Sequence, residues 1–242
     1  GTGTRISHAL RRAASRGVSV QLLIDGFGSK DLDPMHLASL RDAGVSVLLY
    51  RPDISPWTLR TQRLRRLHRK IAVMDAALAF VGGINIIDDM HTPGHTPPRF
   101  DYAVRIEGPL VAQVHQSARR MWMLVSWAQL RRRAPALRSD DPAPIGDGTQ
   151  RAAFVIRDNL RHRSDIEQVY LDAIARAQSE ILIANAYFLP GINFRRALAV
   201  AAARGVRVVL LLQGRVEYVM LHYASRALYG SLLDAGIDRK ST

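Results

Sequence analysis

The chain has 242 residues, 48% of them hydrophobic, which is enough for one large domain or two small ones. It contains no cysteine, so disulfides and thiolate metal sites are excluded. The net charge is +13, carried by 31 Arg and 3 Lys against 17 Asp and 4 Glu. This excess indicates either a compositional bias toward Arg or an anionic partner, a membrane surface or a nucleic acid, and charge alone does not choose between them.

The first fifty residues alternate between helical and strand patterns. A first helix is expected to end at Arg16 and Gly17, because a cation in the last turn followed by Gly is a typical helix stop. The apolar run 18–24 is typical of a strand buried on both faces. A second helix is predicted over 34–43 and a second strand over 45–50. This alternation indicates an α/β layered fold.

The segment 68–85, HRKIAVMDAALAFVGGIN, contains the residue pattern best suited to catalysis. Side chains alternate along a strand, so His68 and Lys70 are expected on one face while Ile71 and Val73 pack into the core from the other. An imidazole can attack a phosphodiester, and an ammonium beside it can bind the non-bridging oxygens. The alternative is a solvated basic strand with no catalytic role.

The same segment predicts a hairpin that ends in two glycines. Asp75 is expected in the turn and 78–81 in the returning strand, so this apolar stretch reads as two strands rather than a membrane span. Gly82 and Gly83 allow close backbone approach, and we expect their N–H groups to receive a phosphate oxygen. Asn85 adds a neutral polar group just beyond them.

The rest of the chain continues the α/β pattern after one interruption. Residues 110–130 have helical spacing, and their Trp and Met side chains are expected to pack in a core. The segment 131–148 is rich in Arg, Pro, Asp and Gly and is interpreted as a linker. A strand is predicted over 151–156, a helix over 164–177 and a further strand over 180–188.

An internal repeat relates the two ends of the chain. Residues 9–24, ALRRAASRGVSVQLLI, align without gaps with residues 197–212, ALAVAAARGVRVVLLL, at 10 of 16 identical positions. A later echo at an offset of 192 relates residues 40–44 to 232–236. The repeat predicts two α/β units of similar plan, with 18–24 and 206–212 as equivalent central strands. The alternative is two unrelated Ala-rich helices, each followed by a buried strand.

At the motif, the sequence resembles the phospholipase D superfamily, and within it the bacterial cardiolipin synthases, nearest the B type. The residues that carry the resemblance are His68-x-Lys70-x4-Asp75-x6-Gly82-Gly83-x-Asn85. The resemblance extends over essentially the whole chain and includes the segments LLIDGFGS (22–29), PRFDYAVRIEGPLV (98–111), ANAYFLPG (184–191) and QGRVEYVMLHYASRALYGSLLDAGI (213–237).

The resemblance implies a bilobal α/β fold in which each lobe supplies one motif to a shared cleft. One His attacks phosphorus to form a covalent phosphohistidine, the other protonates the leaving alcohol, and neither metal nor cofactor is needed. Carried over to this chain, His68 is a catalytic His, Lys70 the phosphate clamp and Asp75 part of the motif's support. Asp101 stands where related enzymes keep an acidic residue that orients the His. Many superfamily members have Ser where this chain has Gly83.

The resemblance also implies an activity and a location. A cardiolipin synthase transfers the phosphatidyl group of one phospholipid to the headgroup hydroxyl of phosphatidylglycerol. We therefore expect phosphatidylglycerol as substrate, an anionic phospholipid membrane as partner and a peripheral position on the bacterial inner membrane. The Arg-rich segments 60–66 and 131–133 are expected to favour anionic lipid. Nucleic acid is not expected as a partner, and a homo-oligomer is left open.

The repeat sets the expected domain organisation. It predicts a first phospholipase D-like unit over 1–130, the linker over 131–148 and the start of a second unit over 149–242. His68 lies 24 residues after Gly44, so its counterpart is expected 24 residues after Gly236, near position 260. No second His-x-Lys occurs in 151–242. We therefore expect a fragment truncated at both ends and inactive alone.

Two other functions are compatible with a single motif. A phosphodiesterase or nuclease of the same superfamily can carry one motif per chain and complete its cleft as a dimer, although the repeat argues for two lobes in one chain. A non-catalytic basic protein that binds membrane or nucleic acid leaves the motif without a purpose.

Overall fold

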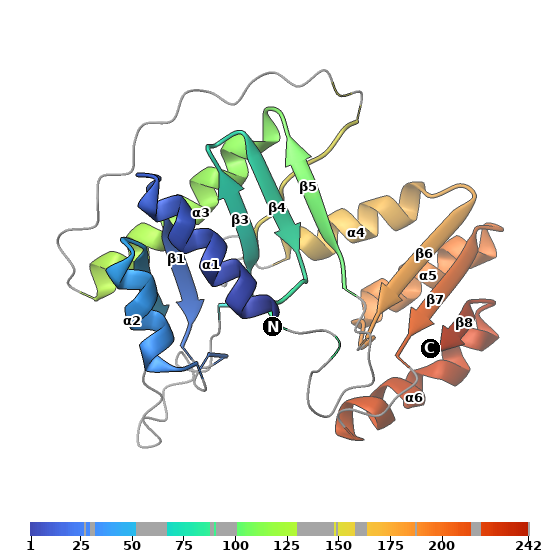
Figure 1. Cartoon of the computed structure of the whole chain (residues 1–242). Helices are drawn as coiled ribbons and strands as arrows, with labels where there is room; N and C mark the ends of the chain where they lie inside the picture. Colours follow the sequence, from blue (N-terminus) through green and yellow to red (C-terminus); the bar gives the residue numbers. More distant parts are fainter. Residues whose placement is uncertain are drawn as a thin grey trace. The chain divides into compact units, whose positions relative to one another are not determined.

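The computed structural model describes residues 1–26, 28–29, 32–51, 67–87, 90, 101–129, 148, 150–157, 164–186, 188–213 and 219–241. They form two compact units, Gly1–Phe154 and Val155–Thr242, which can be followed by colour in Figure 1. The Arg-rich segment 60–66 lies outside the described residues, as does the predicted linker 131–148 apart from Gly148. The architecture is α/β, as the sequence predicts.

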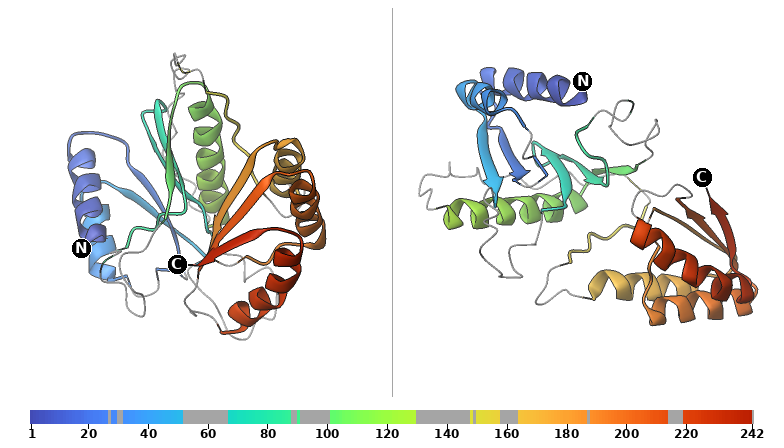
Figure 2. Two further views of the ribbon diagram at one scale, coloured as in Figure 1. Left: turned by 90° about the vertical axis from the view of Figure 1, so that its right-hand side faces the viewer. Right: turned by 90° about the horizontal axis from the view of Figure 1, so that it is seen from below.

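The first unit begins with a parallel strand pair between helices. Strands β1 (Gln21–Asp25) and β2 (Ser46–Tyr50) run parallel. Helices α1 (Thr2–Ser15) and α2 (Pro34–Asp42) cover one face of the pair (Figure 2). The buried side chains of this layer are Leu37, Leu40, Val45 and Val47, and Leu10, Ala14, Val20, Leu22 and Ile24 are partly buried against them.

An antiparallel sheet follows in the first unit. Strands β3 (Lys70–Met74), β4 (Leu78–Gly82) and β5 (Ala103–Glu107) pair in that order. Ile71 lies opposite Val81, which lies opposite Val104. The predicted hairpin is therefore confirmed, with its returning strand one residue longer than expected.

Helix α3 (Leu110–Ala128) packs on both sheets of the first unit. Val111 and Val114 are buried against β3–β5, and Trp122 and Val125 are buried against β1 and β2. The apolar residues recur at helical spacing, so one face of the helix supplies both contacts. The expectation that this segment packs in a core is correct for Trp122, whereas Met123, Leu124 and Trp127 are exposed.

The second unit is a parallel sheet covered by helices. Strands β6 (Glu180–Asn185), β7 (Arg207–Leu212) and β8 (Asp238–Ser241) pair in that order. Helices α4 (Asp165–Arg176), α5 (Ile192–Ala203) and α6 (Val219–Asp234) lie on one side of the sheet in both views of Figure 2. Its buried apolar core includes Leu198, Val208, Leu210, Leu212, Leu232 and Ile237.

The repeat is visible in the hydrogen bonds that end the helices. After α1, Val18 N–H donates to Ala13 O at 3.2 Å, and after α5, Val206 N–H donates to Ala201 O at 3.1 Å. Gly17 and Gly205 have φ of 86° and 88°, the left-handed conformation that glycine adopts without a Cβ penalty. The second pair of similar segments, 40–44 and 232–236, shows the same bond: Val45 N–H donates to Leu40 O, and Ile237 N–H donates to Leu232 O. Equivalent sequence positions thus make equivalent helix ends.

The predicted strand bounds are wrong at three places. The strand expected over 18–24 begins at Gln21, because the amide of Val18 closes the preceding helix instead of pairing in a sheet. All five residues of β1 are half-buried rather than fully buried. Residues 151–156 form no strand, and Phe154 instead packs against the core beneath β3–β5. The strand predicted over 180–188 ends at Asn185.

Adjacent leucines in β7 test the core of the second unit. Leu210 is fully buried and Leu211 is 39% exposed. We expect Leu210→Ala to lower the free energy of unfolding by about 2–5 kcal/mol, because it leaves a cavity in a packed core. Leu211→Ala should cost on the order of 1 kcal/mol, since less apolar area returns to water. Urea denaturation measures both, and equal losses would contradict the assigned faces of β7.

Candidate functional site

His68 and Lys70 lie at the start of the antiparallel sheet. Lys70 is the first residue of β3, and its ladder partner is Gly82. His68 is exposed and precedes the strand by two residues, so the expectation that both side chains belong to one regular strand is wrong. The pairing stops because β4 ends at Gly82, and the next amide, that of Gly83, bonds to Tyr102 on the other side.

The Lys70 ammonium is held close to the backbone of His68. Its Nζ donates to the His68 carbonyl oxygen at 3.3 Å. Partial burial lowers the pKa of Lys70 from its ordinary value, while the carboxylates of Asp101 and Asp25 raise it and offset part of that effect. Lys70 is therefore a cation with two acidic side chains near enough to influence it.

Asp101 lies beside the glycine pair. It is exposed, it lies two residues before β5, and its Oδ1 accepts the N–H of Tyr102 at 2.8 Å. A Cβ built on Gly83 would stand 2.9 Å from Asp101 Cγ and closer still to Oδ1. A side chain at position 83 would therefore occupy the space that the Asp101 carboxylate now fills.

Gly82 is required for a different reason. A Cβ at this position would overlap the carbonyl oxygen of Tyr102 and lie 2.5 Å from Ala103 Cα. These are backbone atoms of the neighbouring strand and cannot rotate away. Gly82 thus permits the close approach of β4 and β5.

The N–H of the second glycine has a partner within the sheet, and its predicted contact with phosphate stays a prediction. The N–H of Gly83 donates to the carbonyl oxygen of Tyr102 at 2.8 Å, so it is committed to the sheet. Asn85 follows β4 and is exposed. The role of Asn85 in substrate binding stays a prediction.

Asp75 occupies the hairpin turn at the far end of β3. It follows Lys70 by five residues, which corresponds to roughly 16 Å along a strand. Asp75 and Ala76 have φ of 51° and 50°, a left-handed conformation in which Asp is enriched. The structure therefore does not bring Asp75 together with His68, and its role in supporting the motif stays a prediction.

Asp25 is the residue that the sequence analysis did not single out. It ends β1, and its Oδ1 accepts the N–H of Leu67, the residue before His68, at 3.1 Å. The available signal was a carboxylate at the end of an apolar strand, inside the segment LLIDGFGS. The carboxyl ends of parallel strands are where α/β folds place functional groups.

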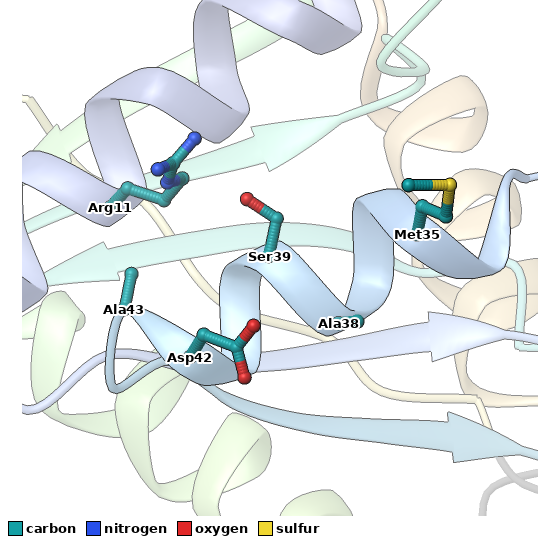
Figure 3. Close-up of a pocket in the computed structure, with 6 residues that line it drawn as sticks. All are labelled: Arg11, Met35, Ala38, Ser39, Asp42 and Ala43. Carbon is teal, nitrogen blue, oxygen red and sulfur yellow. The ribbon is translucent and has the colours of Figure 1, made fainter.

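The hollow shown in Figure 3 lies elsewhere. It has a volume of about 470 Å³. Its lining comes from α1, from α2 and from the residue that follows α2: Arg11, Met35, Ala38, Ser39, Asp42 and Ala43. None of the candidate site residues lines it. Across the described part of the chain, no group of three or more His, Asp or Glu side chains is placed to hold a metal ion.

Comparison with known families and proteins points in one direction. The family described as "Cardiolipin synthase, PLD-like domain" matches residues 2–122 and 170–242. Cardiolipin synthase B of Shigella flexneri and that of Escherichia coli K12 are each 40% identical to the chain over 246 residues, covering 98% of this chain and 56% of theirs. The cardiolipin synthase of Geobacillus thermodenitrificans is 31% identical over 236 residues, covering 97% of this chain and 46% of its own.

The chain thus spans about half the length of the curated relatives it matches. Among solved structures, a polyphosphate kinase from Porphyromonas gingivalis aligns with 86% of this chain and 28% of its own, at a TM-score of 0.46 and 14% identity. That likeness is too low to support an argument about the site.

The two glycines give a paired test of the site geometry. We expect Gly82→Ala to destabilise the fold by about 1–3 kcal/mol, because its methyl group meets fixed backbone atoms. Gly83→Ala should cost less, because the Asp101 side chain can rotate away, but it should displace that carboxylate from Lys70. Urea denaturation and a titration of Lys70 by NMR distinguish the two effects. A Gly83→Ala protein with an unchanged pKa of Lys70 would contradict this placement of Asp101.

Proposed function

Because the chain belongs to the cardiolipin synthase family of phospholipase D-like domains, we propose that it carries one half of a phosphatidyl-transfer site centred on His68. The observation that carries the proposal is the juxtaposition of His68, Lys70 and Asp101 at one end of β3 and β5. The proposed reaction makes cardiolipin from phosphatidylglycerol and a second phospholipid.

The proposed chemistry proceeds in two displacements at phosphorus. In the first, a histidine imidazole nitrogen attacks phosphorus, an N–P bond forms, and the P–O bond to the leaving alcohol breaks as a second acid delivers a proton to that oxygen. In the second, the headgroup hydroxyl of phosphatidylglycerol attacks, its proton returns to the same acid, and the N–P bond breaks. His68 supplies either the nucleophile or the acid, and its exposure leaves the imidazole accessible to substrate.

Lys70 is the proposed phosphate clamp. A point charge beside the imidazole offsets the negative charge that builds on the non-bridging oxygens in each displacement. Its partial burial strengthens such an interaction, because less water screens it. Since Gly83 N–H is committed to the sheet, the ammonium carries more of this task than the sequence alone suggests.

Asp101 is the proposed carboxylate that orients the His68 imidazole. It is near enough to raise the pKa of Lys70, and Gly83 leaves room for it at the end of β4. Asp75 is proposed to support the hairpin, and Asn85 to contact the substrate. The proposal uses no metal or cofactor.

We further propose peripheral attachment to the bacterial inner membrane. The net charge of +13 favours anionic lipid, at about 1 kcal/mol for each cation near the surface. No helix among the described residues is long and apolar enough to cross a membrane.

One observation favours a second candidate. The chain holds a single His-x-Lys, which suits a phosphodiesterase that completes its site by pairing two copies. The third candidate is a non-catalytic protein that only binds membrane or nucleic acid. Under this hypothesis the substitution of His68 changes no enzymatic turnover.

A chimaera tests the transfer proposal. Residues 1–242 replace the matching segment of the Escherichia coli cardiolipin synthase B, and cardiolipin formed from phosphatidylglycerol is measured. We expect turnover that falls at least about 1,000-fold in His68→Ala and about 100- to 1,000-fold in Lys70→Ala. His8→Ala, at an exposed position of α1, is the control and should leave turnover intact. An active chimaera that tolerates His68→Ala would overturn the proposal.

The isolated 242-residue chain gives a second test. One His-x-Lys supplies either nucleophile or acid but not both, so we expect no steady turnover of phosphatidylglycerol by a monomer. Activity is measured across protein concentration with the oligomeric state followed by light scattering. Turnover confined to a dimer would favour the phosphodiesterase-like architecture, and turnover by a monomer would refute the two-histidine chemistry.

Vesicle flotation tests the membrane proposal. We expect the chain to float with vesicles that contain phosphatidylglycerol at low salt and to be released as salt rises, because screening weakens exposed charges. Phosphatidylcholine vesicles are the control. Equal recovery with both kinds of vesicle would count against an electrostatic attachment.

A further inference from the structure

The Asp25 carboxylate joins two segments that are far apart in the sequence. Its Oδ2 accepts the N–H of Gly28 at 3.0 Å, and its Oδ1 accepts the N–H of Leu67 at 3.1 Å. The first bond spans three residues and the second spans 42. Each oxygen therefore has a separate amide, one local and one at the entrance to the His68 segment.

The local bond fixes the direction of the distant one. Asp25 is the last residue of β1, and its own carbonyl oxygen accepts the N–H of Ser29 at 3.1 Å. The amide of Gly26 donates to Tyr50 O at 2.9 Å, which ties the start of the turn to β2. A side chain held by its own turn loses little further freedom when it accepts a second N–H. The bond to Gly28 therefore orients the carboxylate so that Oδ1 can accept the N–H of Leu67.

Both chain neighbours of His68 are hydrogen-bonded, Leu67 through its backbone and Arg69 through its side chain. Leu67 N–H is held by Asp25, and the Arg69 guanidinium donates to Ser117 Oγ of α3 at 3.1 Å. Ser117 is buried, so this second anchor reaches into the packed layer. His68 itself lies outside the β3–β4 ladder, so its position depends on these two bonds and on the bond from Lys70 Nζ to its own carbonyl oxygen.

We propose that Asp25 is a positioning residue that sets the place of His68 through Leu67 and supplies negative charge to Lys70. This inference rests on the proposed function, because it assigns Asp25 a task in the same site. Asp25 acts through the backbone and through its charge, and touches no reacting atom.

The proposed task needs two properties of the Asp25 carboxylate, its pair of acceptor oxygens and its negative charge. Small errors in the place of a reacting group cost large factors in rate, so a fixed backbone before His68 raises turnover rather than substrate affinity. Burial lowers the pKa of Lys70, and Asp101 and Asp25 are the carboxylates that oppose it. Loss of the Asp25 charge therefore lowers that pKa further, and Lys70 gives up its proton at a lower pH.

Three variants of the whole 242-residue chain separate these effects. Asp25→Asn removes the charge and leaves one acceptor oxygen, which the local turn to Gly28 retains, so Leu67 loses its acceptor. Asp25→Glu keeps the charge and displaces the oxygens. Asp33→Asn is the matched control, because Asp33 also accepts a backbone N–H, that of Met35 at 2.8 Å, and Asn caps a helix equally well.

Two NMR measurements read the outcome without any assay of turnover. Lysine labelled with ¹³C at Cε reports the pKa of Lys70, and the chain has only 3 Lys to assign. Amide exchange reports the protection of Leu67. In Asp25→Asn we expect a lower pKa of Lys70 and exchange of Leu67 faster by about 10- to 100-fold. In Asp25→Glu, exchange should rise while the pKa stays near its original value, and Asp33→Asn should change neither.

Unchanged Leu67 exchange and unchanged Lys70 titration in a folded Asp25→Asn protein would overturn the inference. If Asp25→Asn does not fold, the Asp25→Glu variant is the test. A Leu67 amide that stays protected from exchange in Asp25→Glu would also overturn the inference. In the active chimaera, Asp25→Asn should lower kcat about 10-fold or more with KM little changed, and move the alkaline limb of the pH profile to lower pH. A chimaera that makes no cardiolipin counts against the proposed function, while the NMR result still decides the role of Asp25.

Discussion

The first unit depends on one amphipathic helix that packs on two sheets. Val111 and Val114 in the first half of α3 are buried against the antiparallel sheet, and Trp122 and Val125 in the second half against β1 and β2. No ladder joins β2 or β1 to β3 among the described strands, so this shared helix fixes one sheet relative to the other. The Asp25 bond to Leu67 is a polar contact made possible by that packing. Hydrophobic burial holds the two sheets together, and the Asp25 carboxylate bonds to the backbone one residue before His68.

The charge balance around Lys70 follows from its place at a strand start. A lysine on a regular, fully paired strand either points to solvent or is costly to bury. Here partial burial lowers the pKa of Lys70 while two carboxylates, from the ends of β1 and the approach to β5, oppose that effect. A phosphate group that enters such a site meets a cation that is less hydrated than a surface lysine. The neighbouring acids thus favour the charged form of the ammonium, and they also weaken its attraction for an anion.

The sequence predicts the repeated parts of this fold well, because they rest on strong local rules. Gly17 and Gly205 end their helices in the left-handed conformation, and both copies use the same pair of hydrogen bonds. Periodicity also locates the hairpin and its turn at Asp75. These features need only nearby residues, so the chain alone specifies them.

The parts that the sequence does not predict depend on contacts across long separations. The bond from Leu67 to Asp25 spans 42 residues, and no local pattern marks an Asp at a strand end as an acceptor for a particular distant amide. Residues 151–156 have strand-like composition but use Phe154 to cover a core rather than to pair. Gly83 was expected to bind phosphate through its N–H, and that group is taken by Tyr102, whose position depends on a strand twenty residues away.

Gly83 shows how the residues of the proposed site constrain one another. A serine at this position would add a hydroxyl donor, but its Cβ would stand where the Asp101 carboxylate lies. With Gly at position 83, the Asp101 carboxylate can occupy this place. With Ser there, the chain gains the serine hydroxyl, and the carboxylate must lie elsewhere. With Gly83, the backbone amide goes to the sheet and the carboxylate moves in beside Lys70. The departure from the commoner Ser is then not a simple loss of a donor, because it admits a negative charge that would otherwise be excluded from this end of β4.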